Sequence, residues 1–134
     1  MKTEPETYSW EDLVRDTRQK GAEEWTGVRN YQARNTMQQM SVGDEVFVYH
    51  SGKERAIVGI GTVVQNAHPD STDQTGVWAC ADIASVRKLT NPVTLGDIKR
   101  VPALKDMVLV NNSRLSVQPV REQEWKKILE MSGV

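Results

Sequence analysis

The stretch that decides the fold is residues 46–64, whose sequence is VFVYHSGKERAIVGIGTVV. Successive side chains of a strand point to opposite sides of a sheet. The first predicted strand therefore has two faces, Val46, Val48 and His50 on one side and Phe47, Tyr49 and Ser51 on the other. A turn at 51–54 leads to a second predicted strand, 57–64, in which Gly59 and Gly61 share a face. Two glycines on one face are typical of a sharp bend or of a close approach by another segment.

Patterns on both sides of this hairpin predict an α+β domain. Ser9 and Asp12 have the spacing of a capping box, which predicts a helix that ends near Gly21. The other predicted elements are a helix through Ala33, Met37 and Met40, a strand from Val77 to Val86, an irregular helical region from Pro92 to Met107 with Thr94 and Asp97 at its cap, strands at Val108–Val110 and Leu115–Val120, and a closing helix with Trp125, Ile128 and Leu129 on its apolar face. Because short turns favour antiparallel pairing, we expect one domain over residues 1–134, an open, strongly bent, mostly antiparallel β-barrel with peripheral helices.

The composition excludes several classes of protein. The chain has 17 Lys and Arg against 18 Asp and Glu, a formal net charge of -1, which excludes a strongly basic nucleic-acid coat. The single cysteine, Cys80, excludes an internal disulfide and, with only 2 histidines, a cysteine-rich zinc site, so neither a metal nor a cofactor is expected. No apolar stretch approaches the roughly 20 residues of a membrane helix, and no signal peptide is visible. We therefore predict a cytoplasmic protein that does not engage a membrane.

No arrangement in the sequence suggests catalysis. His50 and Ser51 are adjacent on a strand, so they point to opposite faces and cannot form a nucleophile–base pair. His68 precedes a Pro-Asp-Ser turn signal and is interpreted as a solvated loop histidine. Cys80 lies between two alanines in an apolar strand and is interpreted as a small buried hydrophobic residue. The adjacent acids at 23–24 are interpreted as solvated.

Polar side chains gather in three segments where strands end or helices begin, at residues 2–5, 25–31 and 49–52. Aromatic rings beside amide, hydroxyl and imidazole groups suit a planar heterocycle, because the rings stack on its face and the polar groups bind its edge. The alternative is that Trp25 and Tyr31 only cover the core and that Asn30 caps the helix it begins. Arg29 and Arg34 either contact phosphates or belong to a solvated surface.

The same segments resemble those of EVE-domain proteins, a PUA-like group related to the ASCH and YTH domains. The matching strings are KTEP at 2–5, WTGVRNYQARN at 25–35, FVYHSG at 47–52, IVGI at 57–60 and SRLSV at 113–117, in order along essentially the whole chain. The family usually has Ser where Thr3 stands here, so the hydroxyl is kept with an added methyl. The resemblance implies a PUA-like open barrel flanked by helices.

The resemblance also implies a pocket for a modified base, such as 5-methylcytosine or 5-hydroxymethylcytosine in DNA. The residues that match the family's pocket motifs are Lys2, Thr3, Trp25, Val28, Asn30, Tyr49, His50 and Ser51. Arg29 and Arg34 are candidate contacts to the sugar-phosphate backbone. We therefore predict a non-enzymatic, monomeric module that binds modified DNA, with RNA as a further partner, and in which the rings of Trp25 and Tyr49 line one cavity.

Two other functions stay open on the sequence alone. ASCH relatives within the PUA-like group include small hydrolases of modified nucleosides, and here Lys2, Glu4 and His50 would transfer the proton. The other is an RNA-binding or interaction module with an incidental pocket. Direct packing of Trp25 on Tyr49 would favour that last function, because the rings would then fill the pocket themselves.

Overall fold

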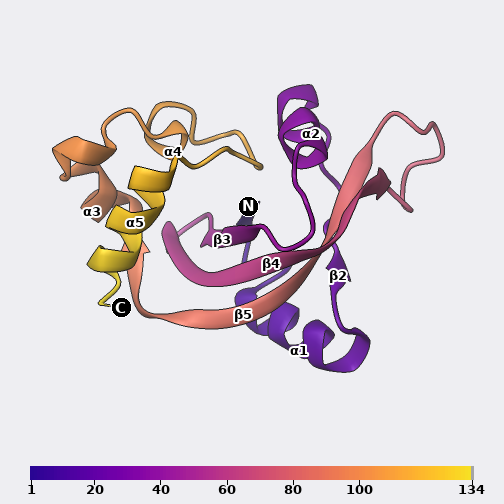
Figure 1. The fold of residues 1–134 in the computed structure, drawn as a ribbon, viewed down its shortest axis with the longest axis horizontal. Coiled ribbons are helices and arrows are strands. Elements are labelled where there is room, and N and C mark those ends of the chain that lie inside the picture. Colours follow the sequence, from indigo (N-terminus) through magenta and orange to yellow (C-terminus); the bar gives the residue numbers. More distant parts are fainter. Residues whose placement is uncertain (134) are drawn as a thin grey trace.

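The structure, a computed structural model, describes residues 1–133 and contains a five-stranded sheet (Figure 1). The strands are β1 (Lys2–Thr3), β2 (Glu23–Glu24), β3 (Glu45–His50), β4 (Ala56–Pro69) and β5 (Ala79–Thr94). Their spatial order is β1-β3-β4-β5-β2, in which β1 is parallel to β3 and all other neighbours are antiparallel. β1 and β2 form opposite edges, so the sheet stays open. The predicted α+β class with an open, mostly antiparallel sheet is confirmed.

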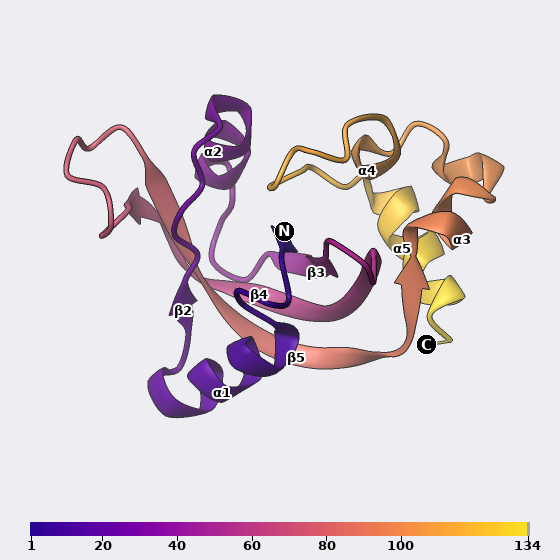
Figure 2. The same cartoon turned by 180° about the vertical axis from the view of Figure 1, so that it is seen from behind.

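The two longest strands, β4 and β5, form a curved ribbon across the molecule (Figure 2). Their pairing shifts register at several places, for example between Ile57 and Gly59 and between Val63 and Gln65. Such shifts interrupt the ladder and increase the local twist, which explains the strong bend. β5 differs from the predicted strand, because it begins at Ala79 and continues through Pro92 to Thr94.

Helices surround this ribbon. Over residues 1–133 they are α1 (Trp10–Lys20), α2 (Tyr31–Gln38), α3 (Leu95–Lys99), the 3-10 turn η1 (Pro102–Leu104), α4 (Val108–Asn111) and α5 (Glu122–Met131). The predicted capping box of α1 is confirmed, because Ser9 Oγ accepts from the Asp12 N–H and the Asp12 carboxylate accepts from the Ser9 N–H. The start of α5 is secured by Glu124, whose carboxylate accepts from the Arg121 N–H at 2.9 Å. None of the helices in the described range is long and apolar enough to cross a membrane.

The two strands predicted after residue 107 are wrong. Residues 108–111 form α4, which buries Leu109. Residues 115–120 form no strand, although Leu115 and Val117 are buried. β3 is already paired on both sides, with β1 and with β4, so this segment cannot join it. The segment instead follows β1, and the Lys2 N–H donates to the Ser116 carbonyl at 2.9 Å.

β3 separates two hydrophobic clusters. Val46 and Val48 belong to the first core, which also contains residues of α1 and α2 and the side chain of Trp25. Phe47 and Tyr49 belong to the second core, which contains residues of α3, α4 and α5. The two-faced strand predicted from the alternation at 46–49 is confirmed.

The glycine pair in β4 permits a close approach, as predicted. A Cβ atom at Gly59 would lie 2.6 Å from the Trp10 ring, so a side chain there would overlap the indole. At Gly61 the corresponding atom would lie 2.9 Å from the Ala84 carbonyl oxygen. The missing side chains thus let α1 and β5 pack directly on the bent strand.

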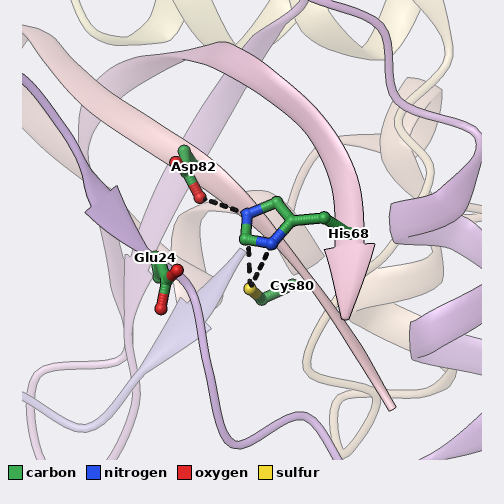
Figure 3. Close-up of side chains that lie close together, drawn as sticks. All are labelled: Glu24, His68, Cys80 and Asp82. Atoms are coloured by element: carbon green, nitrogen blue, oxygen red, sulfur yellow. Dashed lines mark hydrogen bonds and ion pairs between the residues drawn. The ribbon is translucent and has the colours of Figure 1, made fainter. Parts of the chain in front are cut away.

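Two predictions about polar residues need correction, those for His68 and Glu24, and Figure 3 shows both side chains. His68 is not a solvated loop residue; it lies in β4, and its Nε2 is 2.7 Å from Asp82 Oδ1. This hydrogen bond raises the pKa of His68, and the charge of Asp82 adds to the effect. Glu24 is half-buried in β2. Cys80 is buried, as predicted, and its Sγ lies 3.7 Å from His68 Nε2.

Candidate functional site

A hollow beside β1 and β2 has a volume of about 590 Å³. Its walls come from β1 and the turn after it, from β2 and the residues that follow, and from the loop between β4 and β5. The lining residues are Lys2, Thr3, Glu4, Thr7, Tyr8, Glu23, Glu24, Trp25, Thr26, Ser71 and Thr72. The volume falls within the range of about 300–1,000 Å³ that is typical of ligand pockets. We call this hollow the β1–β2 cavity.

Two aromatic rings form one wall of the β1–β2 cavity. Trp25 and Tyr8 meet edge to face, with ring centroids 6.1 Å apart and an interplanar angle of 87°. Tyr8 OH donates to the Asp16 carboxylate at 2.7 Å, and Asp16 also pairs with Arg15 at 3.1 Å. Burial and the hydrogen bond to Asp16 raise the pKa of Tyr8. Tyr8 is therefore a neutral, oriented ring at neutral pH.

The part of the β1–β2 cavity that β1 forms is held in place by hydrogen bonds to backbone carbonyl groups. Thr3 Oγ1 donates to the Tyr8 carbonyl at 2.7 Å, which closes the turn that carries Tyr8. Lys2 Nζ donates to the Ser113 carbonyl. The Ser51 N–H donates to the Thr3 carbonyl at 2.9 Å. The Thr3 hydroxyl keeps its lone pairs free to accept a hydrogen bond from a ligand.

The lining of the β1–β2 cavity is acidic. Glu4, Glu23 and Glu24 stand against one basic side chain, Lys2. Glu24 Oε2 accepts from Ser71 Oγ at 2.6 Å, and Glu23 pairs with Lys20 at 3.3 Å. Carboxylate oxygens accept hydrogen bonds and repel anions. The cavity therefore suits a ligand group that donates hydrogen bonds better than it suits a phosphate.

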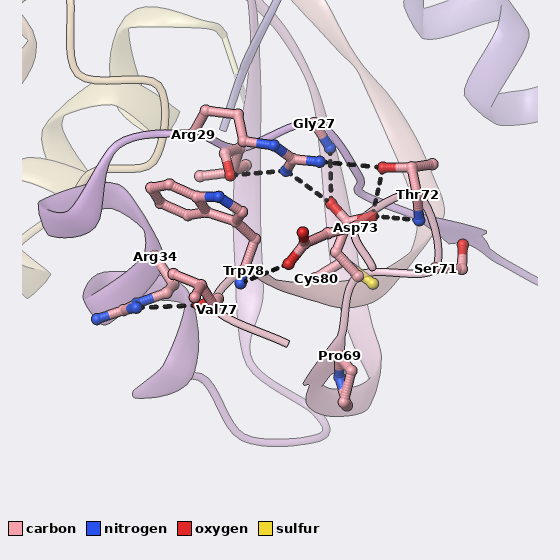
Figure 4. Close-up of polar contacts among 12 residues, drawn as sticks. Gly27, Arg29, Arg34, Pro69, Ser71, Thr72, Asp73, Val77, Trp78 and Cys80 are labelled. Carbon is pink, nitrogen blue, oxygen red and sulfur yellow. Dashed lines mark hydrogen bonds and ion pairs between the residues drawn. The ribbon is translucent and has the colours of Figure 1, made fainter. Parts of the chain in front are cut away.

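A buried carboxylate, Asp70, holds the third wall in place. Figure 4 labels three of its hydrogen-bond partners, Gly27, Arg29 and Thr72. Asp70 accepts hydrogen bonds from the Gly27 N–H at 2.9 Å, from Arg29 Nη1 at 3.1 Å and from Thr72. Burial alone would raise the pKa of Asp70, but the hydrogen bonds from Thr72, Gly27 and Arg29 hold it at about 2. Asp70 thereby fastens the β4–β5 loop, with Ser71, to the segment after β2.

Of the predicted pocket residues, Lys2, Thr3 and Trp25 line the β1–β2 cavity. Val28 and Asn30 do not. Val28 is buried in the first core, and Asn30 is exposed and caps α2, because its Oδ1 accepts from the Ala33 N–H at 3.0 Å. The structure therefore agrees with the alternative interpretation of the sequence, in which Asn30 caps its helix.

The three predicted pocket residues at 49–51, where β3 ends, support the β1–β2 cavity but do not line it. The expectation that Trp25 and Tyr49 line one cavity is wrong, because Tyr49 faces the second core and Trp25 the first. His50 is buried; its Nε2 accepts from the Trp10 N–H at 3.0 Å and its Nδ1 lies 2.7 Å from Glu54. His50 thus joins α1 to β3, and it is not placed to transfer protons with Lys2 and Glu4 in the cavity.

Arg29 and Arg34 lie outside the β1–β2 cavity, in an exposed aromatic patch formed with Tyr31 and Trp78. The two rings stack with centroids 4.9 Å apart, and Tyr31 is 60% exposed. The Arg34 guanidinium lies 4.9 Å from the Tyr31 centroid and donates to the Val77 carbonyl at 2.9 Å. Arg29 lies 5.7 Å from the Trp78 ring. We call Arg29, Tyr31, Arg34 and Trp78 the arginine–aromatic patch.

Sequence reasoning missed several lining residues, above all Tyr8, Glu24, Ser71 and Thr72. A local signal existed for Tyr8, because an aromatic directly before a capping Ser9 commonly packs against the first turn of the helix. No local signal existed for Ser71 and Thr72, which reach the cavity through the fold of the β4–β5 ribbon.

The comparison with protein families decides the identity. The sequence model described as the EVE domain matches residues 1–131. The chain belongs to the EVE domain family. A crystal structure of Atu2648 from Agrobacterium tumefaciens is 46% identical, with a TM-score of 0.93 over 99% of this chain and 90% of that one. The human THYN1 protein, in a crystal structure with DNA containing 5-methylcytosine, is 33% identical, with a TM-score of 0.93 over 100% of this chain and 96% of that one.

A more distant structure extends the fold relationship of this EVE domain. The YTH domain of Zygosaccharomyces rouxii MRB1 superposes with a TM-score of 0.53 at 18% identity, over 90% of this chain and 78% of that one. At that identity the likeness shows the fold alone. The predicted EVE family and the predicted PUA-like fold are both confirmed.

Proposed function

We propose that this EVE domain is a non-enzymatic nucleic-acid-binding module that captures a modified base of DNA, such as 5-methylcytosine or 5-hydroxymethylcytosine, in the β1–β2 cavity. The observation that supports this most is an aromatic wall, Trp25 and Tyr8, that faces carboxylate and hydroxyl acceptors in a hollow of about 590 Å³. Family membership adds support, because human THYN1 is seen with DNA that contains 5-methylcytosine.

The chemistry of the lining favours cytosine over an anionic ligand. Cytosine carries an exocyclic amino group that donates hydrogen bonds, and Glu is a common acceptor for that group in protein–DNA recognition. Glu4, Glu23 and Glu24 supply such acceptors, and Trp25 supplies a ring face on which the base stacks. The phosphates stay outside, where Arg29 and Arg34 are the proposed contacts.

The energies predict a preference for single strands. Extruding a base from a duplex costs a few kcal/mol, and stacking on an aromatic ring returns about 1–3 kcal/mol. A chain with a net charge of -1 gains little from phosphate contacts. One buried methyl group contributes about 0.8 kcal/mol, roughly fourfold in affinity. We therefore expect stronger binding to single-stranded or mispaired DNA than to duplex DNA, with modest discrimination for the methyl group.

The test is calorimetric titration of the wild type and Trp25→Ala with a single-stranded DNA oligonucleotide that carries one 5-methylcytosine, and with its unmodified counterpart. We expect the wild type to bind the modified strand about fourfold more tightly. Trp25→Ala should weaken binding by about fivefold or more, because the stacking surface is removed. Trp125→Phe is the control, since Trp125 packs in the second core and leaves the cavity unchanged.

Equal affinity of the wild type for both strands would contradict recognition of the modification. Equal affinity of Trp25→Ala and wild type, with both folded by circular dichroism, would contradict the location in the β1–β2 cavity. The same titration with the RNA strand decides between DNA and RNA as partner. Incubation with alkylated nucleosides tests the hydrolase alternative, which predicts a product that His50→Ala fails to form. A monomeric state and a cytoplasmic location stay predictions from the sequence.

A further inference from the structure

Four side chains with metal-binding atoms meet where β5 pairs with β4 on one side and with β2 on the other (Figure 3). They are Glu24, His68, Cys80 and Asp82. Each contributes one ligand atom, and these four atoms all lie within 4.8 Å of one another. The group combines an imidazole nitrogen, a sulfur and two carboxylate oxygens. Neither the predicted fold nor the proposed base recognition accounts for this combination.

The strand register explains why these residues meet. Cys80 and Asp82 are two positions apart on β5, so their side chains share a face of the sheet. His68 is the cross-strand partner of Cys80 in β4, and Glu24 is the cross-strand partner of Asp82 in β2. Directly opposed residues in neighbouring strands also share a face. The sheet therefore builds a four-cornered cluster from two adjacent cross-strand pairs.

Two distances within the cluster lie on either side of the spacing around a tetrahedral ion. His68 Nε2 lies 3.7 Å from Cys80 Sγ and 2.7 Å from Asp82 Oδ1. Zinc bonds of about 2.0–2.3 Å place neighbouring ligand atoms roughly 3.5 Å apart in a tetrahedron. The His68–Asp82 contact therefore has to open by less than about 1 Å to admit an ion.

Outer contacts orient two of the four ligands. His68 Nδ1 lies 3.2 Å from the Pro69 carbonyl, so a proton on Nδ1 can be donated there while Nε2 keeps its lone pair for an ion. Ser71 Oγ donates to Glu24 Oε2 at 2.6 Å. Such contacts are typical of metal ligands, because they hold the ring or carboxylate in one orientation.

The charge at the sulfur also points to a cation. The carboxylates of Glu24 and Asp82 lie in one cluster with the buried sulfur of Cys80. The two acids create a negative potential around this sulfur. A divalent cation at this point compensates that potential and binds the sulfur as thiolate.

From this geometry we propose that Glu24, His68, Cys80 and Asp82 bind one divalent cation of the zinc class, with the ion replacing the hydrogen bond between His68 and Asp82. A nitrogen, a thiolate and carboxylates in a four-coordinate arrangement suit Zn²⁺ better than Mg²⁺ or Ca²⁺, which prefer six or more oxygen ligands. The sequence predicted no metal, because spacing along the chain does not reveal ligands that come from three strands. The cluster shares Glu24 with the β1–β2 cavity, so an ion bound there would also hold one of the acceptors proposed for the base.

The test is titration of the chelator-treated full chain with Co²⁺ and with Zn²⁺. We expect one ion per chain, a thiolate-to-cobalt charge-transfer band, and the visible bands of tetrahedral Co²⁺. Zn²⁺ should displace Co²⁺ and raise the melting temperature by mass action. Cys80→Ser should lose the charge-transfer band, and Asp82→Asn should weaken Zn²⁺ binding by about tenfold or more.

Glu23→Gln is the matched control for Glu24→Gln, because Glu23 is the neighbouring acid in β2 and is not part of the cluster. Glu23→Gln should retain the wild-type affinity for Zn²⁺, whereas Glu24→Gln should lose affinity. No saturable binding to the folded wild type, or binding without the thiolate band, would overturn the proposal. Equal Zn²⁺ affinity of wild type and a folded Asp82→Asn would overturn it as well. Oligonucleotide titrations in the presence of chelator keep this result separate from that for base recognition.

Discussion

The two sides of the sheet use aromatic pairs in opposite ways. On one side Trp25 and Tyr8 meet edge to face and border a hollow of about 590 Å³. On the other side Phe47 and Trp125 stack with centroids 3.7 Å apart at 15°, and the hollow next to Phe47 has a volume of only about 30 Å³. The second volume is about that of a single water molecule.

The difference shows that aromatic content alone does not indicate a binding site. Phe47 and Trp125 are covered by the protein's own helices, so their contribution is to the free energy of unfolding. Trp25 is also mostly buried, but part of its surface lines the β1–β2 cavity next to polar groups. We therefore expect substitutions on the two sides to separate stability from ligand binding.

The largest effect should come from Phe47→Ala in the second core. Removing a buried phenyl ring leaves a cavity, and the free energy of unfolding should fall by about 3–5 kcal/mol. The affinity of the folded variant for the modified oligonucleotide should stay unchanged, because Phe47 does not line the β1–β2 cavity. Urea denaturation measures the first quantity and low-temperature calorimetry the second.

If Phe47→Ala does not fold, Phe47→Leu allows the same comparison of stability and ligand binding with a smaller loss of stability. A folded variant at Phe47 that loses as much affinity as Trp25→Ala would show that the two sides are not independent.

An intermediate effect is expected for Asp70→Asn, which affects both stability and the cavity wall. The amide cannot accept the charge-assisted bonds from Arg29 and Thr72 as the carboxylate does, so unfolding should become easier by about 1–3 kcal/mol. Affinity for the oligonucleotide should also fall, because the loop with Ser71 loosens. Asp73→Asn is the control, since Asp73 bonds only within its loop, to Thr75 and Trp78.

The difference in stability between the wild type and Asp70→Asn should also depend on pH. The folded-state pKa of Asp70, about 2, is below its ordinary value of 3.8, so the ionised form stabilises the fold. The stability advantage of the wild type over Asp70→Asn should be complete above about pH 4 and should shrink as the pH falls toward 2. Denaturation curves over that range measure it, and a constant difference would show that Asp70 does not titrate as described.

The smallest effect should come from Arg34→Gln in the arginine–aromatic patch. If Arg34 contacts a phosphate, its removal should weaken oligonucleotide binding about twofold to fivefold and reduce the slope of log K against log salt by about 1. The effect should be small because the guanidinium already bonds to the Val77 carbonyl. Arg100→Gln, at the far end of α3, is the control. If the slope of log K against log salt does not change, Arg34 does not contact a phosphate and only covers Trp78.

The sequence predicted the fold well where the signal was local. The alternation at 46–50, the Ser9 capping box and the two glycines of β4 each correspond to an observed contact. The strands predicted after residue 107 failed because burial of Leu109 and Leu115 resembles a strand pattern, whereas residues 108–111 form α4 and residues 115–120 lie beside the β1 edge without forming a strand.

The site was predicted only in part. The reason lies in the alternation of side chains along the strand that contains Tyr49. The alternation places Tyr49 on the opposite face from Val46 and Val48, and Trp25 belongs to the same core as those two valines. A cavity shared by Trp25 and Tyr49 was therefore incompatible with the predicted strand once the position of Trp25 was fixed. The contribution of Ser71 depends on the length and twist of the β4–β5 ribbon, which local patterns do not specify.

The distribution of the four tryptophans gives this domain built-in optical reporters. Trp10 lies in the first core, Trp125 beside the second, Trp25 at the β1–β2 cavity and Trp78 in the arginine–aromatic patch. Variants that retain a single indole would let intrinsic fluorescence follow each region separately. Quenching of Trp25 alone would mark the entry of a ligand, while a red shift of Trp10 or Trp125 would mark the opening of one core before the other.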